Sequence, residues 1–144
     1  MSDFFGIDIK TLDDDGFQFC QTGLIRKVLE ATGMEHSNGL PTPTKVEAPL
    51  GTYVNGSEAK RDWTNSYASV IGMMLHLVSN TIPDISFAFH HCARFTHNTK
   101  ASHKTAVKRI CRYLQGTKDG VLVFNPSKKL VVDCYADAYY QNCS

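Results

Sequence analysis

The sequence lacks the features of secreted and membrane-spanning proteins. No apolar run exceeds a few of the 144 residues, and Met1-Ser2-Asp3 begins neither the basic nor the apolar region of a signal peptide. The five cysteines are an odd number and form no CxxC pair, which favours reduced thiols in an intracellular protein over disulfides. No phosphate-binding glycine loop, GxSxG elbow or HExxH motif is present, so motifs alone indicate no catalytic machinery.

Acidic residues are absent from one long stretch. Residues 1–62 carry ten acidic and six basic residues, whereas no carboxylate lies between Asp84 and Asp119. The candidate nucleic-acid-binding residues in that stretch are Arg94, Lys100, Lys104, Lys108, Arg109 and Arg112. On a helix, the spacing of Lys104, Lys108 and Arg112 lines one face with charge suited to a phosphate backbone. The alternative is an ordinary solvated helix face, which basic stripes on amphipathic helices commonly form.

The hydrophobic pattern of the first half predicts a hairpin, a helix and a loop. Alternation over residues 4–20, interrupted by an acidic Asp-Gly turn, predicts a β-hairpin. Apolar residues at helical spacing then predict a short amphipathic helix with Thr22 as N-cap and Gly33 as its C-terminal stop. Three of the five prolines fall within residues 35–62, which predicts a long connecting loop.

The second half is helical by pattern and ends in strands. One apolar stripe over residues 67–78 and a second after Pro83 predict a helical hairpin. A third helix is predicted over residues 102–115, ended by Gly116. Residues 121–124 and 130–137, on either side of an Asn-Pro-Ser turn, predict two antiparallel strands of an incomplete sheet. The fold class is therefore α+β.

Two clusters contain residue types that bind metals. The first consists of His90, His91, Cys92, His97 and His103. Its spacing matches no zinc pattern with two separated ligand pairs, so a core position for Cys92 and exposed or hydrogen-bonded histidines are the preferred interpretation. The second is the turn at residues 13–15, whose three aspartates are interpreted as solvated. The prediction is no metal site in this chain.

Asp137 ends an apolar strand, where a carboxylate is well placed to hold a divalent metal for phosphoryl transfer. Two-metal hydrolysis needs several converging carboxylates, and residues 138–144 contain none. An ordinary surface aspartate is the preferred alternative for this chain.

Several ordered motifs resemble one family. They are residues 5–9 (FGIDI), 67–77 (YASVIGMMLHL), 81–85 (TIPDI), 112–117 (RYLQGT) and 135–138 (YADA). In this order and spacing they resemble copia-type LTR-retrotransposon Pol polyproteins, where the reverse transcriptase runs into RNase H. The resemblance implies the end of the palm hairpin and first helix at 1–34, and a linker at 35–62. It implies a helical thumb/connection segment at 63–117, and the start of a truncated RNase H-like domain at 118–144.

The resemblance also implies a function. The parent enzyme is an RNA-directed DNA polymerase with RNase H activity, uses Mg²⁺, and serves transposition and DNA integration. Its Tyr-x-Asp-Asp box is expected upstream of Met1, and Asp137 matches the first RNase H carboxylate of an incomplete site. The expected partners are an RNA–DNA or DNA duplex, bound weakly and without sequence preference, and the remainder of the polyprotein. The expected location is intracellular, in cytoplasmic virus-like particles or the nucleus. The alternative is a noncatalytic helical binding module, or an inactive remnant with no nucleic-acid role.

Overall fold

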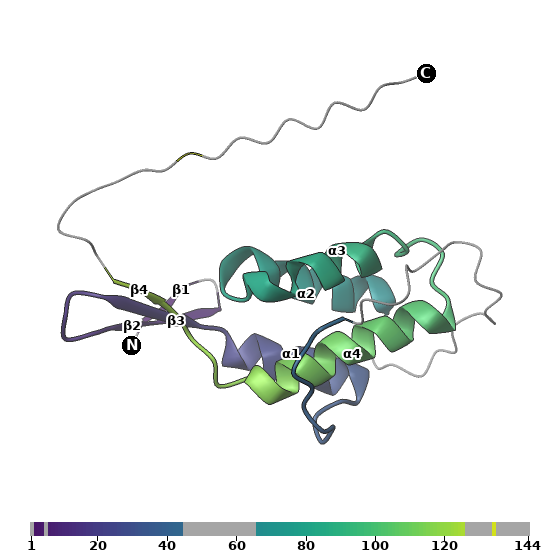
Figure 1. Ribbon diagram of the computed structural model, residues 1–144, viewed down its shortest axis with the longest axis horizontal. Helices are drawn as coiled ribbons and strands as arrows, with labels where there is room; N and C mark the ends of the chain where they lie inside the picture. Colours follow the sequence, from purple (N-terminus) through teal and green to yellow (C-terminus); the bar gives the residue numbers. More distant parts are fainter. Residues whose placement is uncertain (1, 5, 45–65, 126–133, 135–144) are drawn as a thin grey trace.

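The computed structural model describes residues 2–4, 6–44, 66–125 and 134. Its elements are four strands, four α-helices and a 3₁₀ turn, so the predicted α+β class is confirmed. The helices stack in two layers, α2 and α3 above α1 and α4, and the sheet lies beyond one end of them (Figure 1).

The predicted N-terminal hairpin is present and gains one strand. Strands β1 (Ser2–Phe4), β2 (Ile7–Thr11) and β3 (Phe17–Cys20) pair antiparallel in sequence order. Asp15 adopts a φ of 62° in the turn between β2 and β3, a conformation that aspartate tolerates better than most residues. The Leu12 N–H closes this turn by donating to the Gly16 carbonyl at 2.8 Å.

The fourth strand comes from the other end of the described chain. Strand β4 (Leu122–Phe124) confirms the strand predicted at 121–124, and it pairs antiparallel with β3. The sheet order is therefore β1-β2-β3-β4, and residues 122–124 extend the N-terminal sheet. The strand predicted at 130–137 lies outside the described residues except for position 134, so an RNase H-like domain there stays a prediction.

Helix α1 (Thr22–Thr32) ends where predicted and begins differently. Gly33 takes a left-handed φ of 67° at the C-cap, which glycine adopts without strain. The prediction of Thr22 as N-cap is wrong: Gln21 occupies that position and makes no side-chain capping bond. Gln21 is buried instead, because its amide contacts His76 Nδ1 at 2.8 Å and accepts the Thr81 hydroxyl at 2.8 Å.

The predicted helical hairpin is confirmed. Helix α2 (Tyr67–Asn80) is capped by Ser66, whose side chain accepts the Ser69 N–H at 3.2 Å. Pro83 then opens the 3₁₀ turn Pro83–Ile85, which leads directly into α3 (Ser86–Ala93). The third predicted helix is α4 (Ala101–Thr117). The prediction that Gly116 ends α4 is wrong, because this glycine lies inside the last turn.

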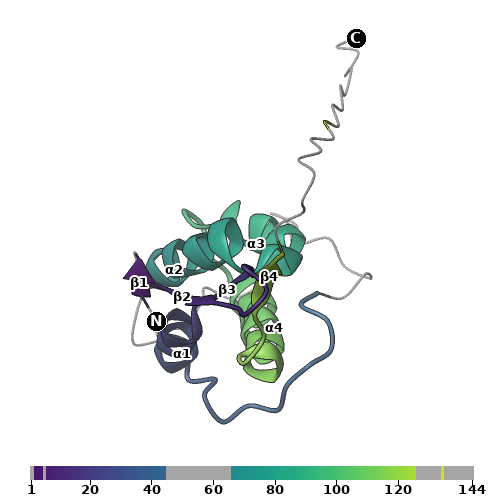
Figure 2. The ribbon, with the colours of Figure 1, turned by 90° about the vertical axis from the view of Figure 1, so that its left-hand side faces the viewer.

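The hydrophobic core lies entirely between the helices. Each helix contacts two neighbours, α1 with α2 and α4, and α3 with α2 and α4, so the four form a closed ring (Figure 2). The fully buried side chains at its centre include Val28, Met74, Leu77, Ile110 and Leu114. No helix in the described part of the chain is long and apolar enough to span a membrane.

Candidate nucleic-acid interface

Helix α4 carries most of the candidate residues and is fixed by its apolar side. His103, Val107, Ile110, Cys111 and Leu114 recur at helical spacing and are buried against α1 and α3. The opposite side therefore faces outward. Lys104 and Lys108 flank the buried stripe, Arg109 and Arg112 lie farther round the helix, and all four are half-buried.

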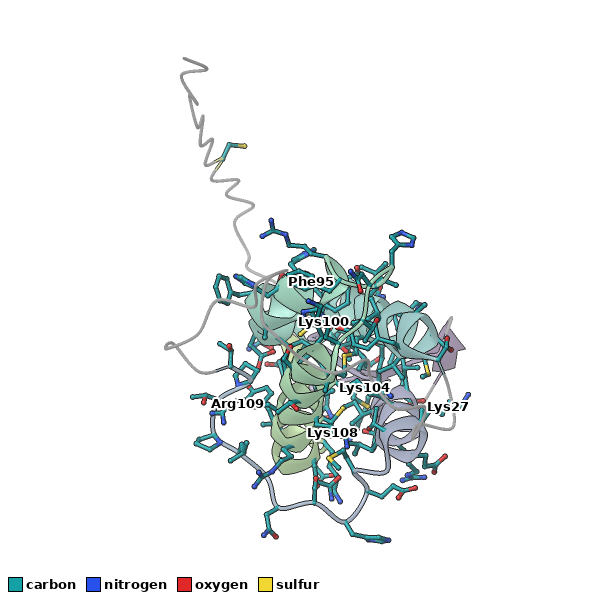
Figure 3. The ribbon with its side chains drawn as sticks, turned by 90° about the vertical axis from the view of Figure 1, so that its right-hand side faces the viewer. Lys27, Phe95, Lys100, Lys104, Lys108 and Arg109 are labelled. Atoms are coloured by element: carbon teal, nitrogen blue, oxygen red, sulfur yellow. The ribbon has the colours of Figure 1, made fainter. Side chains whose placement is uncertain are left out.

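The other two candidates lie near the N-terminal end of α4. Lys100 is its N-cap residue, and exposed Arg94 is the C-cap residue of α3. Figure 3 looks along α4 toward this end and shows Lys100, Lys104 and Lys108 gathered on it, while Lys27 lies on α1. Three lysines of the acid-free stretch thus lie along the first half of α4, whereas Lys118 is the C-cap residue at its other end.

Two of the arginines donate hydrogen bonds to a neighbouring segment. Residues 35–44, here called the strap, run antiparallel to α4. Arg112 Nε donates to the Asn38 carbonyl at 2.9 Å, and the Leu40 N–H donates to the Arg112 carbonyl at 3.1 Å. Arg109 Nη2 donates to the Thr42 hydroxyl at 2.8 Å. These bonds join residues at least 67 positions apart, so the sequence pattern alone could not reveal them.

The strap approaches α4 most closely at two glycines. A Cβ on Gly39 would lie 2.8 Å from Gly116 Cα, and a Cβ on Gly116 would lie 3.3 Å from Gly39 Cα. Both neighbouring atoms belong to backbone, which cannot swing aside as a side-chain tip can. Gly116 therefore allows the strap to contact the helix, a role different from the predicted helix stop.

The N-terminal end of α4 is fixed by an aromatic stack. The His103 ring lies 4.1 Å from the Phe95 ring at an interplanar angle of 15°. Its Nδ1 accepts the Lys100 N–H at 3.1 Å, one of the backbone donors that a helix start leaves unsatisfied. The prediction of a hydrogen-bonded His103 is confirmed, and its partner orients the backbone at Lys100.

Within the histidine and cysteine cluster, Cys92 and His103 are buried, whereas His90 and His97 are exposed. Cys92 is buried, as predicted, and its carbonyl accepts the Tyr67 hydroxyl at 2.9 Å. Burial raises the pKa of the Cys92 thiol to about 12 and that of Cys111 to about 11. Across the described ranges, no three His, Cys, Asp or Glu side chains are grouped to hold a metal ion.

The acidic turn at residues 13–15 belongs to the sheet and not to α4. Asp14 accepts the Gly16 N–H at 3.3 Å and so belongs to the hairpin turn. Asp137 lies outside the described residues. The described residues thus supply no ligand set for the Mg²⁺ expected of the parent enzyme.

The sequence pattern missed one groove, of 620 Å³, between the start of α1 and the end of α4. Its charged lining is of mixed sign, with Arg26, Glu30, Glu35, Lys118 and Asp119. The groove depends on contact between segments almost a hundred residues apart, where the Thr22 hydroxyl donates to the Lys118 carbonyl at 3.4 Å. Mixed charge distinguishes it from the basic side of α4.

The relatives of the chain include Pol polyproteins of two transposons. It is 30% identical over 135 residues to a retrovirus-related Pol polyprotein from transposon RE1 of Arabidopsis thaliana, covering 94% of this chain. It is 32% identical over 125 residues to the corresponding polyprotein from transposon TNT 1-94 of Nicotiana tabacum, covering 82% of this chain. An uncharacterized mitochondrial protein of Arabidopsis thaliana is 29% identical over 98% of this chain.

The chain is thus a homologue of one segment of retrotransposon Pol polyproteins. The polyproteins that it matches include those of copia-type transposons, so the resemblance in its motifs is confirmed. The chain spans 9% of the length of each of the two polyproteins and 56% of the mitochondrial protein. No protein-family model and no solved structure matches it.

Proposed function

We propose that the chain is the part of a reverse transcriptase/RNase H polypeptide that binds a nucleic-acid duplex through its backbone. The observation that carries the proposal is the acid-free stretch between Asp84 and Asp119, folded so that Lys104 and Lys108 lie one turn apart on one flank of α4. A backbone-binding surface needs positive charge without interleaved carboxylates, because duplex phosphates are repelled by them. Homology to Pol polyproteins supports nucleic acid as the partner.

The proposed contact is positional and independent of sequence. Lys104 and Lys108 are one helical turn apart, so they follow a phosphate backbone that runs along α4. Arg109 and Arg112 support this surface indirectly, since their N–H groups anchor the strap. The buried stripe of α4 holds the lysines on a rigid element, which reduces the entropy lost on binding.

The wider assignment is part of the same proposal. Residues 1–34 would end the palm, residues 63–117 would form the thumb/connection, and residues 118–144 would start RNase H with Asp137 as its first carboxylate. In the parent enzyme Mg²⁺ would supply the phosphoryl-transfer chemistry, and the protein would act inside the cell. The residues described here bind and orient a duplex in this proposal, and they cut nothing.

The test is the salt dependence of duplex binding. An RNA–DNA hybrid and a DNA duplex are titrated with the chain at several salt concentrations, using fluorescence anisotropy. Lys104→Ala/Lys108→Ala should weaken binding to both and reduce the slope of log affinity against log salt by about two, or about one for each phosphate that is no longer neutralised. Lys27→Ala is the matched control, because it removes an exposed lysine from α1.

The alternative of a basic module for an acidic protein gives a different result. In that case the wild-type chain binds neither duplex in a salt-dependent way. An unchanged slope in the double variant, with thermal unfolding like that of the wild type, would equally overturn the assignment to α4.

A further inference from the structure

Helix α3 exposes an aromatic side chain beside a histidine and an arginine. Phe87 is 68% exposed, more than any other large apolar side chain in the described part of the chain. Arg94, the C-cap residue, keeps helical geometry with φ −60° and ψ −22°. Since each residue turns an α-helix by about 100°, positions 87, 91 and 94 lie within about 60° of one another. Phe87, His91 and Arg94 therefore form one outward surface, here called the α3 face.

The exposure of Phe87 follows from the packing of α3. Ala88, Phe89 and Cys92 are buried on the other side of this helix, which contacts α2 and α4. A rotation of α3 that buried Phe87 would bring these three side chains toward water. The core thus already has its aromatic residue in Phe89, and Phe87 is left for another contact.

The ring of Phe87 is restrained but still accessible. The His91 ring lies 5.1 Å from it at an interplanar angle of 61°, an edge contact along one helical turn. A restrained ring loses less side-chain entropy when a ligand stacks on it. A flat aromatic surface open to solvent is the group on which single-stranded nucleic acids stack their bases.

The charge around the α3 face suits a phosphate. The sequence has no carboxylate between Asp84 and Asp119, and Asp84 accepts the Tyr113 hydroxyl from α4. Exposed Arg94 lies about 10 Å along the helix from Phe87, at a rise of about 1.5 Å per residue. A single strand presents a base and a phosphate together, so a ring and a cation on one face favour it over an apolar polypeptide.

We propose that the α3 face binds an unpaired nucleotide where a single strand leaves the duplex. Phe87 stacks on the base and Arg94 contacts a phosphate, without base preference, because every base has a π-face. The inference rests on the proposed function, in which α4 holds the adjoining duplex. The two surfaces adjoin, since Phe95 follows Arg94 and stacks on His103 in the first turn of α4.

Three labelled hybrids separate the base from the phosphate. The first is a blunt RNA–DNA hybrid, the second carries a single-stranded extension of its DNA, and the third carries the same extension with abasic sites. Fluorescence anisotropy gives the affinity of wild type, Phe87→Ala, Phe87→Leu, Phe87→Trp and Arg94→Ala for each hybrid. Leu75→Ala is the matched control, because Leu75 is an apolar side chain of α2 that is 49% exposed.

Loss of the ring should affect only the hybrid with extension bases. Phe87→Ala and Phe87→Leu should weaken binding to it by about five- to hundredfold and change the blunt and abasic hybrids by less than about twofold, as expected for one base–aromatic stack. Phe87→Trp should retain the wild-type affinity. Arg94→Ala should weaken both extended hybrids, because both keep their phosphates. Leu75→Ala should change none of the three.

Two results would overturn the stacking role. One is a wild-type chain that binds the extended and abasic hybrids equally, a measurement that needs no variant to fold. The other is wild-type affinity in Phe87→Leu, which would indicate an apolar contact of the kind that a protein partner makes. Failure of the duplex proposal is seen separately, as a blunt hybrid that shows no salt-dependent binding.

Discussion

The helix ring and the sheet bury their apolar residues to very different extents. Met74, Leu77 and Ile110 are fully buried between helices, whereas Phe17, Val123 and Phe124 in the sheet are each more than 40% exposed. Both regions follow their expected periodicity, 3.6 in the helices and 2 in the strands. Correct patterning thus creates an apolar face in each, and only the helices find a covering layer within the described chain. The difference shows that a correct periodic pattern creates an apolar face but does not by itself bury it.

Removing a side chain from each region gives the largest expected contrast. Met74→Ala should lower the free energy of unfolding by about 2–5 kcal/mol, because it opens a cavity in a dry core. Phe124→Ala should cost about 1 kcal/mol or less, mostly because its edge-to-face packing with Phe19 disappears. Urea unfolding followed by circular dichroism measures both. Comparable losses of stability at the two positions would show that the sheet shares the stability of the helix ring.

Glycine substitutions probe the strap in the same way. Gly39→Ala forces backbone apart at Gly116 and should cost about 1–3 kcal/mol. Gly72→Ala is the control, since a Cβ there meets nothing within 4 Å. It should stabilise α2 by roughly 0.5–1 kcal/mol, the difference in helix propensity. Thermal melts of the two variants should therefore move in opposite directions, and a shared direction would contradict the close approach of strap and helix.

The smallest effect concerns alkaline pH. The Tyr113 hydroxyl donates to the Asp84 carboxylate, and this bond, helped by burial, raises the tyrosine pKa from 10 to about 12. Between these values the unfolded chain has lost the proton that the folded chain still holds, so stability falls as pH rises from 10 to 12. Tyr113→Phe should reduce that fall, measured as the urea midpoint at pH 9 and 11. The buried thiols titrate in both proteins and cancel in the comparison, so an identical fall would contradict the role of this pair.

Local sequence signals predicted the helices and strands, but they could not predict contacts between residues that are far apart in the chain. Gly33 could be predicted as the end of α1, because glycine adopts a left-handed backbone conformation without any contact to a distant residue. Pro83 marks a helix start for a similarly local reason. Gln21, and not Thr22, is the N-cap residue, and its side-chain amide accepts a hydrogen bond from Thr81, 60 positions away. The pairing of β3 with β4 could not be predicted for the same reason, since no pattern within residues 121–124 indicates which strand they pair with.

In the candidate interface, too, some features could be predicted from the sequence and others depend on the fold. The acid-free stretch and the helical spacing predict that Lys104 and Lys108 share one flank of α4, and the structure leaves both half-buried there, while their contact with nucleic acid stays a prediction. The strap bonds of Arg109 and Arg112 required knowledge of where residues 38–42 lie. A side chain's charge can be read from the sequence, whereas the group that it contacts depends on the fold.

The contact between Thr22 and Lys118 has a consequence for the order of folding. It brings the start of α1 beside the end of α4. Strand β3, which precedes α1 in the sequence, and strand β4, which follows α4, therefore begin next to each other. Before the ring forms, pairing Phe17 with Phe124 means closing a loop of more than a hundred flexible residues, which is entropically costly. Once the ring has formed, that closure has already been made. We therefore expect β4 to pair with β3 late in folding. The rate of this pairing should then report how fast the helices assemble.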